Sequence, residues 1–241
     1  MKTRREFLGM AVGAAMLPAL EWEQTEVYST GRAEVPEMLD HVLLGCADLE
    51  RGIAWVEERT GVKAAFGGVH PGRGTQNALL SLGERRYLEI IAPDPNQEST
   101  PDVIAKYVAT LAEPKLVTWA AHPGSAQEVA QKLAKEKVQA VGPTAGSRKR
   151  PDGSELHWST VNLKDNLDGL LPFFIEWSAD SVHPSVDAPK GCELRSFGAV
   201  SPTPDILMMK YRQIGIEIDV ERGEKARLTA RIVGPKGAME L

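Results

Sequence analysis

The chain has 241 residues, an ordinary globular composition and a formal net charge of −5. This length allows one large domain or two small ones, and the apolar residues suffice to bury a core. Residues 1–20 have more basic than acidic side chains, so the rest of the chain carries about −7. Because nucleic-acid affinity depends on neutralising phosphates with Lys and Arg, this acidity excludes a nucleic-acid partner as the expected ligand.

The N-terminus resembles a twin-arginine export signal. Arg4 and Arg5 precede a weakly apolar run at 9–20 that is rich in Ala, Gly and Met. The run is shorter than the roughly 20 strongly apolar residues of a membrane span, so an integral membrane protein is not expected. We predict a signal segment at 1–20, a polar linker at 21–36, and a periplasmic or secreted product. An uncleaved anchor, or a chance Arg pair on a buried helix, is the alternative, and the absence of an Ala-x-Ala motif leaves the cleavage position open.

Two cysteines, Cys46 and Cys192, lack the CxxC spacing of a metal or redox motif. They are compatible with one disulfide in an oxidising compartment, but two separate buried thiols are the favoured reading.

Residues 39–93 form the first of two similar units. An apolar strand at 39–45 carries His41, and a helix follows with Asp48 in the N-cap position. A Gly-rich loop at 66–74 then leads to two strands, the second of which places Glu89 in an apolar run where an unpaired charge would be costly.

Residues 116–177 repeat this order. A strand at 116–121 precedes the capping box 125–128 and its helix, and paired strands close the unit. Glu176 falls at the same place in its strand as Glu89 does in the first unit. Between helix and strands, the basic run 147–150 lies in a turn-rich stretch and is expected to be a solvated loop.

A third, shorter unit is predicted at 190–241, with a strand, a helix that has Pro204 at its first position, and alternating strands. Repetition of one strand–helix–strand unit predicts the α+β fold class.

Four segments resemble the glyoxalase-like domain of the vicinal oxygen chelate superfamily: 39–44, 67–79, 87–91 and 172–177. The resemblance implies that 37–178 holds two βαβββ modules forming a cup-shaped mixed sheet with helices packed outside. It also implies that 190–241 is a third, shorter module of this kind. An odd number of units leaves open whether the cup closes within one chain or in a homodimer.

The same resemblance implies a site for a divalent metal ion such as Zn, Mn, Fe or Ni. His41, Glu89 and Glu176 match three of its ligands, while the fourth position falls near Thr118 or Trp119, neither of which is a metal ligand. Glu176 is also the candidate catalytic residue, because a carboxylate not tied to the metal can act as a base. The candidate substrate-binding residues that would line the cup are His70, Arg73, Gln76 and His157.

The resemblance indicates a metal-assisted lyase, isomerase or dioxygenase acting on a small oxygenated substrate, in which the metal stabilises enediolate-like charge. The alternatives are a metal-free protein that binds or sequesters a small molecule, or a scaffold that works through its surface. Each candidate also has a structural reading, since a histidine on an apolar strand is often a hydrogen-bonded core residue and a buried Glu often pairs with Arg.

Overall fold

The computed structural model describes residues 34–97 and 103–241, so the predicted signal segment at 1–20 lies outside the described residues. The described part is α+β, as predicted. Its helices are α1 Leu49–Thr60, α2 Val103–Ala109, α3 Ala126–Lys135, α4 Pro184–Asp187 and α5 Pro204–Ile214. Its strands are β1 Leu39–Gly45, β2 Ala65–His70, β3 Thr75–Ser81, β4 Tyr87–Pro93, β5 Lys115–Ala121, β6 Ala140–Lys149, β7 Glu155–Leu163, β8 Phe173–Trp177, β9 Glu193–Ser201, β10 Asp219–Arg222, β11 Arg227–Gly234 and β12 Gly237–Glu240.

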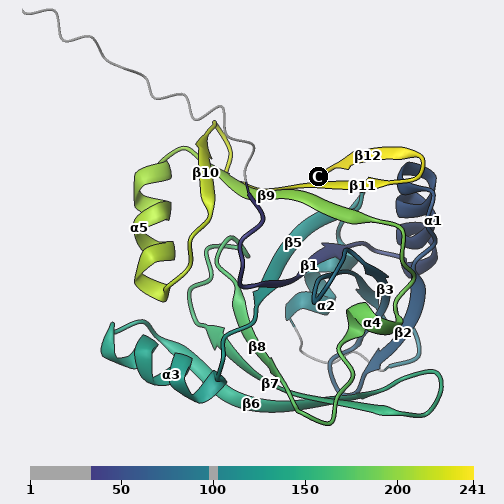
Figure 1. Ribbon diagram of the computed structural model, residues 1–241, viewed down its shortest axis with the longest axis horizontal. Helices are drawn as coiled ribbons and strands as arrows, with labels where there is room; N and C mark the ends of the chain where they lie inside the picture. The colour runs from purple at the N-terminus through teal and green to yellow at the C-terminus, as the bar shows by residue number, and fades with distance from the viewer. Residues whose placement is uncertain (1–33, 98–102) are drawn as a thin grey trace, which may run out of the picture. The chain divides into compact units, whose positions relative to one another are not determined.

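Two βαβββ modules form one mixed sheet of eight strands in the order β2-β3-β4-β1-β5-β8-β7-β6 (Figure 1). In each module the first strand pairs in parallel with the last one, β1 with β4 and β5 with β8. The modules join through the antiparallel pair of β1 and β5. The first strands therefore lie at the centre of the sheet, which puts β1 and its histidine between the two halves.

The predicted helix ends are confirmed by their capping contacts. The Asp48 side chain accepts the backbone N–H of Arg51 at 2.8 Å, and Gly61 ends α1 with φ of 81°. The Ser125 hydroxyl accepts the N–H of Glu128 at 3.3 Å and begins α3. Within residues 34–97 and 103–241, no helix is long and apolar enough to cross a membrane.

The two Gly-rich connections expected to be loops are largely strands. Residues 65–70 form β2 and residues 140–149 form β6, and both are the edge strands of the large sheet. The basic run is therefore not a solvated loop, because Arg148 in β6 is only 4% exposed. Glycine lowers the sequence signal for a strand, but it tolerates the bends of an edge strand.

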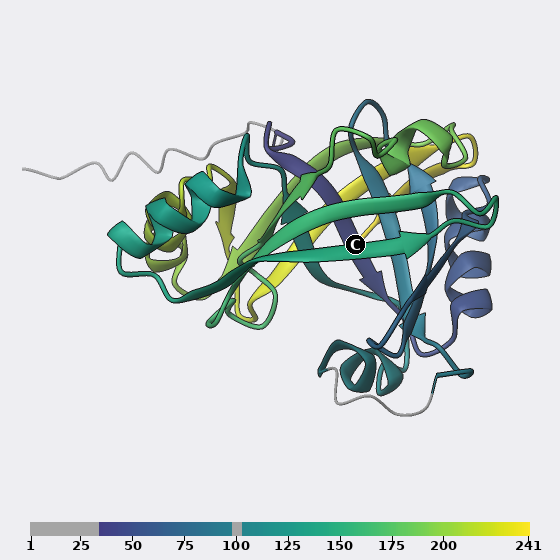
Figure 2. The ribbon, with the colours of Figure 1, turned by 90° about the horizontal axis from the view of Figure 1, so that it is seen from below.

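The large sheet curls until its two edge strands touch. β2 contacts β6 although they stand at opposite ends of the strand order. Gly68 permits this approach, since a Cβ there would lie 2.7 Å from the carbonyl oxygen of Lys149. Figure 2 shows the long hairpin of β6 and β7 running across the front of the view. The curl gives the sheet a concave face within a single chain.

The third unit keeps the predicted order of elements but pairs its strands differently. Its small sheet has the order β10-β9-β11-β12, so the first strand lies inside the sheet between the second and third. It packs on the second module through a shared acceptor. The carbonyl oxygen of Leu170 accepts the Trp119 indole N–H at 2.8 Å and the Tyr211 hydroxyl at 2.7 Å. Trp119 is fully buried, so its role at this position is structural.

The cysteines are separate, as favoured from the sequence: Cys46 and Cys192 are both free and buried.

The close approach at Gly68 yields a stability prediction. Gly68→Ala places a methyl group against the β6 backbone at a φ of 140°, so we expect a loss of at least about 2 kcal/mol in unfolding free energy. Gly72→Ala is the matched control, because Gly72 has a φ of 73° but no atom lies near its Cβ position. There we expect about 1 kcal/mol from backbone strain alone. Urea unfolding of both variants measures the difference, and equal losses would contradict the closed-edge geometry.

Candidate functional site

A cavity of about 1120 Å³ opens on the concave face of the large sheet. Along β1, β3, β4 and β8 every second residue lines it, because successive strand side chains point to opposite faces, whereas β5 contributes the consecutive residues 115–118. The lining residues of the four alternating strands are His41 and Leu43 of β1, Thr75 and Asn77 of β3, Tyr87, Glu89 and Ile91 of β4, and Phe173, Ile175 and Trp177 of β8, and β7 adds Trp158, Thr160, Asn162 and Leu163.

Asp40 and His41 form a buried hydrogen-bonded pair in β1. His41 Nδ1 lies 2.6 Å from Asp40 Oδ1, and neither residue is more than 2% exposed. Neighbouring strand residues normally face opposite sides, but the pairing of β1 with β5 shifts between Leu39 and His41. This bulge lets the Asp40 carboxylate reach the ring of its own neighbour.

The Asp40 carboxylate also receives two further donors. Its Oδ2 lies 3.2 Å from His183 Nε2 and 3.1 Å from the indole nitrogen of Trp177. Burial alone would raise the pKa of Asp40, but the hydrogen bonds of His183 and His41 outweigh it and hold that pKa well below its usual range. Since an ionised carboxylate only accepts hydrogen bonds, Nδ1 of His41 carries its proton and Nε2 is left to face the cavity.

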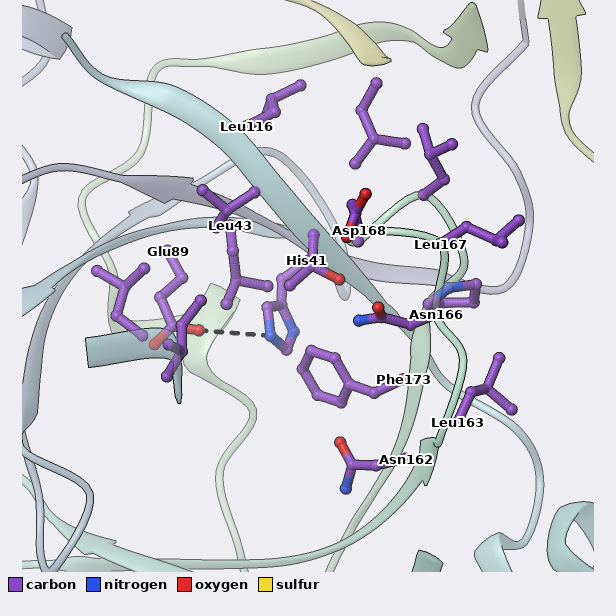
Figure 3. A pocket seen from close by; sticks show the side chains of 18 of the residues that line it. His41, Leu43, Glu89, Leu116, Asn162, Leu163, Asn166, Leu167, Asp168 and Phe173 are labelled. Atoms are coloured by element: carbon purple, nitrogen blue, oxygen red, sulfur yellow. Dashed lines mark ion pairs between the residues drawn. The ribbon is translucent and has the colours of Figure 1, made fainter. Parts of the chain in front are cut away.

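Glu89 is the group that faces this nitrogen. Its Oε2 lies 3.4 Å from His41 Nε2, and its Oε1 accepts the Asn77 side-chain N–H at 2.8 Å (Figure 3). Burial would raise the pKa of Glu89, but the charges of His70 and His41 and the Asn77 hydrogen bond lower it. The site therefore holds an ionised carboxylate against an imidazole.

Aromatic rings fix the imidazole in this position. The parallel register of β1 and β4 sets His41 beside Tyr87, and the two rings stack with centroids 4.4 Å apart. Phe173 approaches the edge of the imidazole at 5.6 Å. Figure 3 shows Phe173 and Glu89 on either side of His41, with Asn162 and Asn166 on the same side as Phe173.

This geometry suits proton transfer. A proton on His41 Nε2 points at the Glu89 carboxylate, so one proton can reside on either group. Whichever group holds it is an acid, and the other is a base within reach of a molecule in the cavity. Both groups are almost fully buried, which strengthens their electrostatic interaction.

Two of the four predicted substrate-binding residues line the cavity. His70 hydrogen-bonds Thr75 at 2.8 Å and lies 3.7 Å from Glu89, and Arg73 lies on the rim. Gln76 and His157 do not line it, because each precedes a lining residue by one position. Gln76 donates to the carbonyl of Pro93, and the half-exposed His157 lies 3.9 Å from the Glu155 carboxylate.

Glu176 is not brought together with His41 and Glu89. Its neighbours Ile175 and Trp177 line the cavity, so strand alternation points Glu176 to the other face. There its carboxylate accepts the N–H of Ala126 at 2.8 Å, at the N-terminus of α3. A carboxylate at this end of a helix stabilises the helix, which gives Glu176 a structural role.

The side chains do not fit the expected metal site. In the part of the chain that the structure describes, no three His, Cys, Asp or Glu side chains are arranged to hold a metal ion. His41 and Glu89 supply two donors, whereas protein metal centres of this kind use three or four. Thr118 lines the cavity at the fourth position but has no ligand for a divalent ion better than a hydroxyl.

Sequence reasoning missed several residues of the site. Asp40 lies in the predicted strand at 39–45, but strand alternation alone would point its side chain away from that of His41. His183 lies in a connection between units and had no motif to mark it. Arg148 was assigned to a loop, yet it lines the cavity.

The sequence pattern of the family described as glyoxalase-like domain matches residues 39–215. The crystal structure of a hypothetical protein from Staphylococcus aureus superposes with a TM-score of 0.65 at 16% identity, covering 84% of this chain and 97% of that one. That likeness shows the fold. No curated protein matches the chain in sequence.

Two epimerase structures superpose less well. Methylmalonyl-CoA epimerase from Mycobacterium tuberculosis has a TM-score of 0.42 at 21% identity, covering 60% of this chain and 89% of that one. A Streptomyces coelicolor methylmalonyl-CoA epimerase in complex with 2-nitronate-propionyl-CoA has a TM-score of 0.45 at 16% identity, with 61% and 99% covered.

The lowered pKa of Asp40 predicts a pH dependence of stability. A carboxyl whose folded pKa is depressed contributes stability that is fully present above its ordinary pKa, near 4, and is lost as pH falls through the folded pKa. We expect Asp40→Asn to lose about 1.5–3 kcal/mol at neutral pH and to show a flatter decline below about pH 4 than the unsubstituted protein. Urea unfolding between about pH 7 and pH 2 measures this. Asp180→Asn, at an exposed carboxyl, should leave the curve unchanged, and parallel curves for Asp40→Asn would contradict the assignment.

Proposed function

The chain belongs to the family of glyoxalase-like domains, and on that premise we propose that it is an enzyme that moves a proton at a carbon next to a carbonyl group. The substrate is a small oxygenated molecule, and the reaction is of the isomerase or lyase type. The observation that carries this proposal is the His41–Glu89 pair, 3.4 Å apart at the wall of the cavity.

Each group has a defined part in the proposed reaction. The basic member of the pair takes the proton from carbon, and the acidic member returns a proton to carbon or oxygen of the enolate. Asp40 holds the imidazole orientation from behind, and Asn77 orients the Glu89 carboxylate. Tyr87 and Phe173 keep water from the ring, since they cover its face and edge.

The proposed reaction has no step that uses a metal ion, because the side chains of the site do not fit one. The resemblance implies Zn, Mn, Fe or Ni, but Glu176, the third expected ligand, faces α3. His41 Nδ1 is held by Asp40, so only Nε2 is left as a possible donor, and with Glu89 it makes two of the three expected ligands. The proposed chemistry rests on the acid–base pair alone.

A metal-free binding protein is the second candidate. The size of the cavity and its many apolar lining residues favour it, because ligand sites are mostly apolar with a few placed polar groups. It differs from the enzyme in one respect that can be measured: the ligand binds but its carbon-bound protons do not exchange.

Export remains a proposal drawn from residues 1–20. Arg4 and Arg5 with the following apolar run support passage through the twin-arginine route.

Hydrogen–deuterium exchange tests the proposed reaction. Short 2-oxo and 3-oxo acids and their esters are incubated in D₂O with the protein, and proton NMR follows loss of the α-carbon signals. Glu89→Gln and His41→Gln should each slow the exchange at least about 100-fold, since general acid–base groups contribute about 10²–10⁴.

Glu176→Gln is the matched control. It removes the same charge from the other face of the sheet, so we expect exchange to persist while unfolding free energy falls by about 1 kcal/mol. Exchange that survives Glu89→Gln but not Glu176→Gln would overturn the assignment. Binding without exchange in the unsubstituted protein would favour the second candidate.

Export is tested by cell fractionation. In a bacterium that has the twin-arginine route, replacing Arg4 and Arg5 together by Lys should retain the protein in the cytoplasm, because the route reads the arginine pair. Unchanged periplasmic or secreted yield would contradict the proposal.

A further inference from the structure

Arg148 is a buried cation on the wall of the cavity. It lies near the end of β6, where its backbone pairs with Leu156 of β7, and only 4% of it is exposed. Its side chain shares the cavity with His41, Tyr87 and Glu89. It comes from β6, an edge strand that is not a neighbour of β1 or β4 in the sheet. It lines the same cavity as His41 and Glu89 because the sheet curls.

The guanidinium of Arg148 is incompletely satisfied. Its Nη1 is buried and has no hydrogen-bond partner among the described residues. Glu89 is the carboxylate that acts most strongly on Arg148, but its ion pairs are with His41 and His70, and none within 4.0 Å joins it to Arg148. Leaving a charged donor buried and unpaired is costly, so such a group calls for a partner.

The surroundings of Arg148 indicate an anionic partner. An arginine keeps its charge when buried and presents flat, paired donors that match a carboxylate. The other lysine and arginine side chains of the lining are exposed or half-buried: Arg73, Lys115, Lys210 and Arg227. Arg148 is therefore the cation that lies deepest beside the reacting pair.

The rest of the cavity is suited to an apolar body. One stretch of its lining is aliphatic and comes from β5, the end of β7, the loop before β8, and α5: Leu116, Val117, Leu163, Leu167, Ile206 and Leu207. Figure 3 shows Leu163 and Leu167 on the far side of His41 from Glu89. A three-carbon acid would leave most of this surface uncovered, whereas a longer chain would bury it.

We propose that Arg148 binds the carboxylate of an oxo acid whose carbon chain lies along the aliphatic lining and whose reacting carbon faces His41 and Glu89. This inference rests on the proposed function for the reacting carbon, but the binding of the carboxylate by Arg148 is independent of turnover. Arg148 then determines specificity, since it selects acids over their uncharged analogues.

Calorimetric titration tests this with 2-oxohexanoate and its uncharged amide as probes, in a buffer low in chloride. The unsubstituted protein should bind the acid at least about tenfold more tightly than the amide. Arg148→Gln should weaken acid binding at least about tenfold and leave amide binding unchanged. Arg148→Lys should retain part of the preference, because it keeps the charge but not the paired donors.

Lys149→Gln is the matched control. It removes the same charge from the next residue of β6, which does not line the cavity, and it should preserve the preference for the acid. Equal affinity for acid and amide in the unsubstituted protein, or no binding of either, would overturn the proposal without any variant. So would an acid preference that survives Arg148→Gln.

Two further outcomes are distinguishable. Inorganic phosphate binding more tightly than 2-oxohexanoate, with the same dependence on Arg148, would overturn the carboxylate assignment. Acid binding that depends on Arg148, without proton exchange in D₂O, would support this proposal while the proposed function fails. If Arg148→Gln does not fold, which circular dichroism shows, the acid–amide comparison and Arg148→Lys decide the matter.

Discussion

The buried Asp40 carboxylate is the constraint on which the site depends. An ionised group with no solvent exposure is tolerated only when its oxygens are fully hydrogen-bonded. Its three donors come from His41 in β1, Trp177 in β8 and His183 beyond β8. Satisfying this one charge therefore ties the centre of the sheet to the second module and to the segment that leads into the third unit. The imidazole orientation, and with it the distance to Glu89, follows from that requirement.

The second constraint is strand parity. A side chain reaches the cavity only if it occupies the correct one of two alternating positions, so an error of one residue reverses the outcome. Glu89 meets this condition and Glu176 does not, although both stand near the middle of apolar strands with similar patterns. Two modules with the same order of elements thus do not place equivalent residues at equivalent points.

The sequence was sufficient for the fold class, both modules, the helix caps and the presence of His41 and Glu89 in one site, because these features have local signatures: apolar periodicity, capping residues and charges in apolar runs. It was insufficient for the edge strands β2 and β6, because glycines in both strands and a proline in β6 weaken the sequence pattern of a strand. The sequence also does not show which face of the sheet a strand residue occupies. Gln76, His157 and Glu176 were therefore expected in the cavity, although they do not line it. The position of Asp40 in the site depends on a β-bulge, and that of Arg148 depends on closure of the sheet edges. The position of His183 depends on how the connection between units folds back. These are properties of the assembled chain rather than of any segment.

The shared carbonyl of Leu170 has a consequence for how such a molecule can diversify. Through Trp119 and Tyr211 it anchors α5, whose residues Ile206 and Leu207 form part of the cavity wall. The proposed acid–base pair stands on β1 and β4, in a different module. Substitutions along α5 can therefore reshape the space offered to a ligand while His41 and Glu89 stay untouched. The His41–Glu89 pair and part of the cavity wall are thus inherited on separate stretches of one polypeptide, so that each can evolve with little effect on the other.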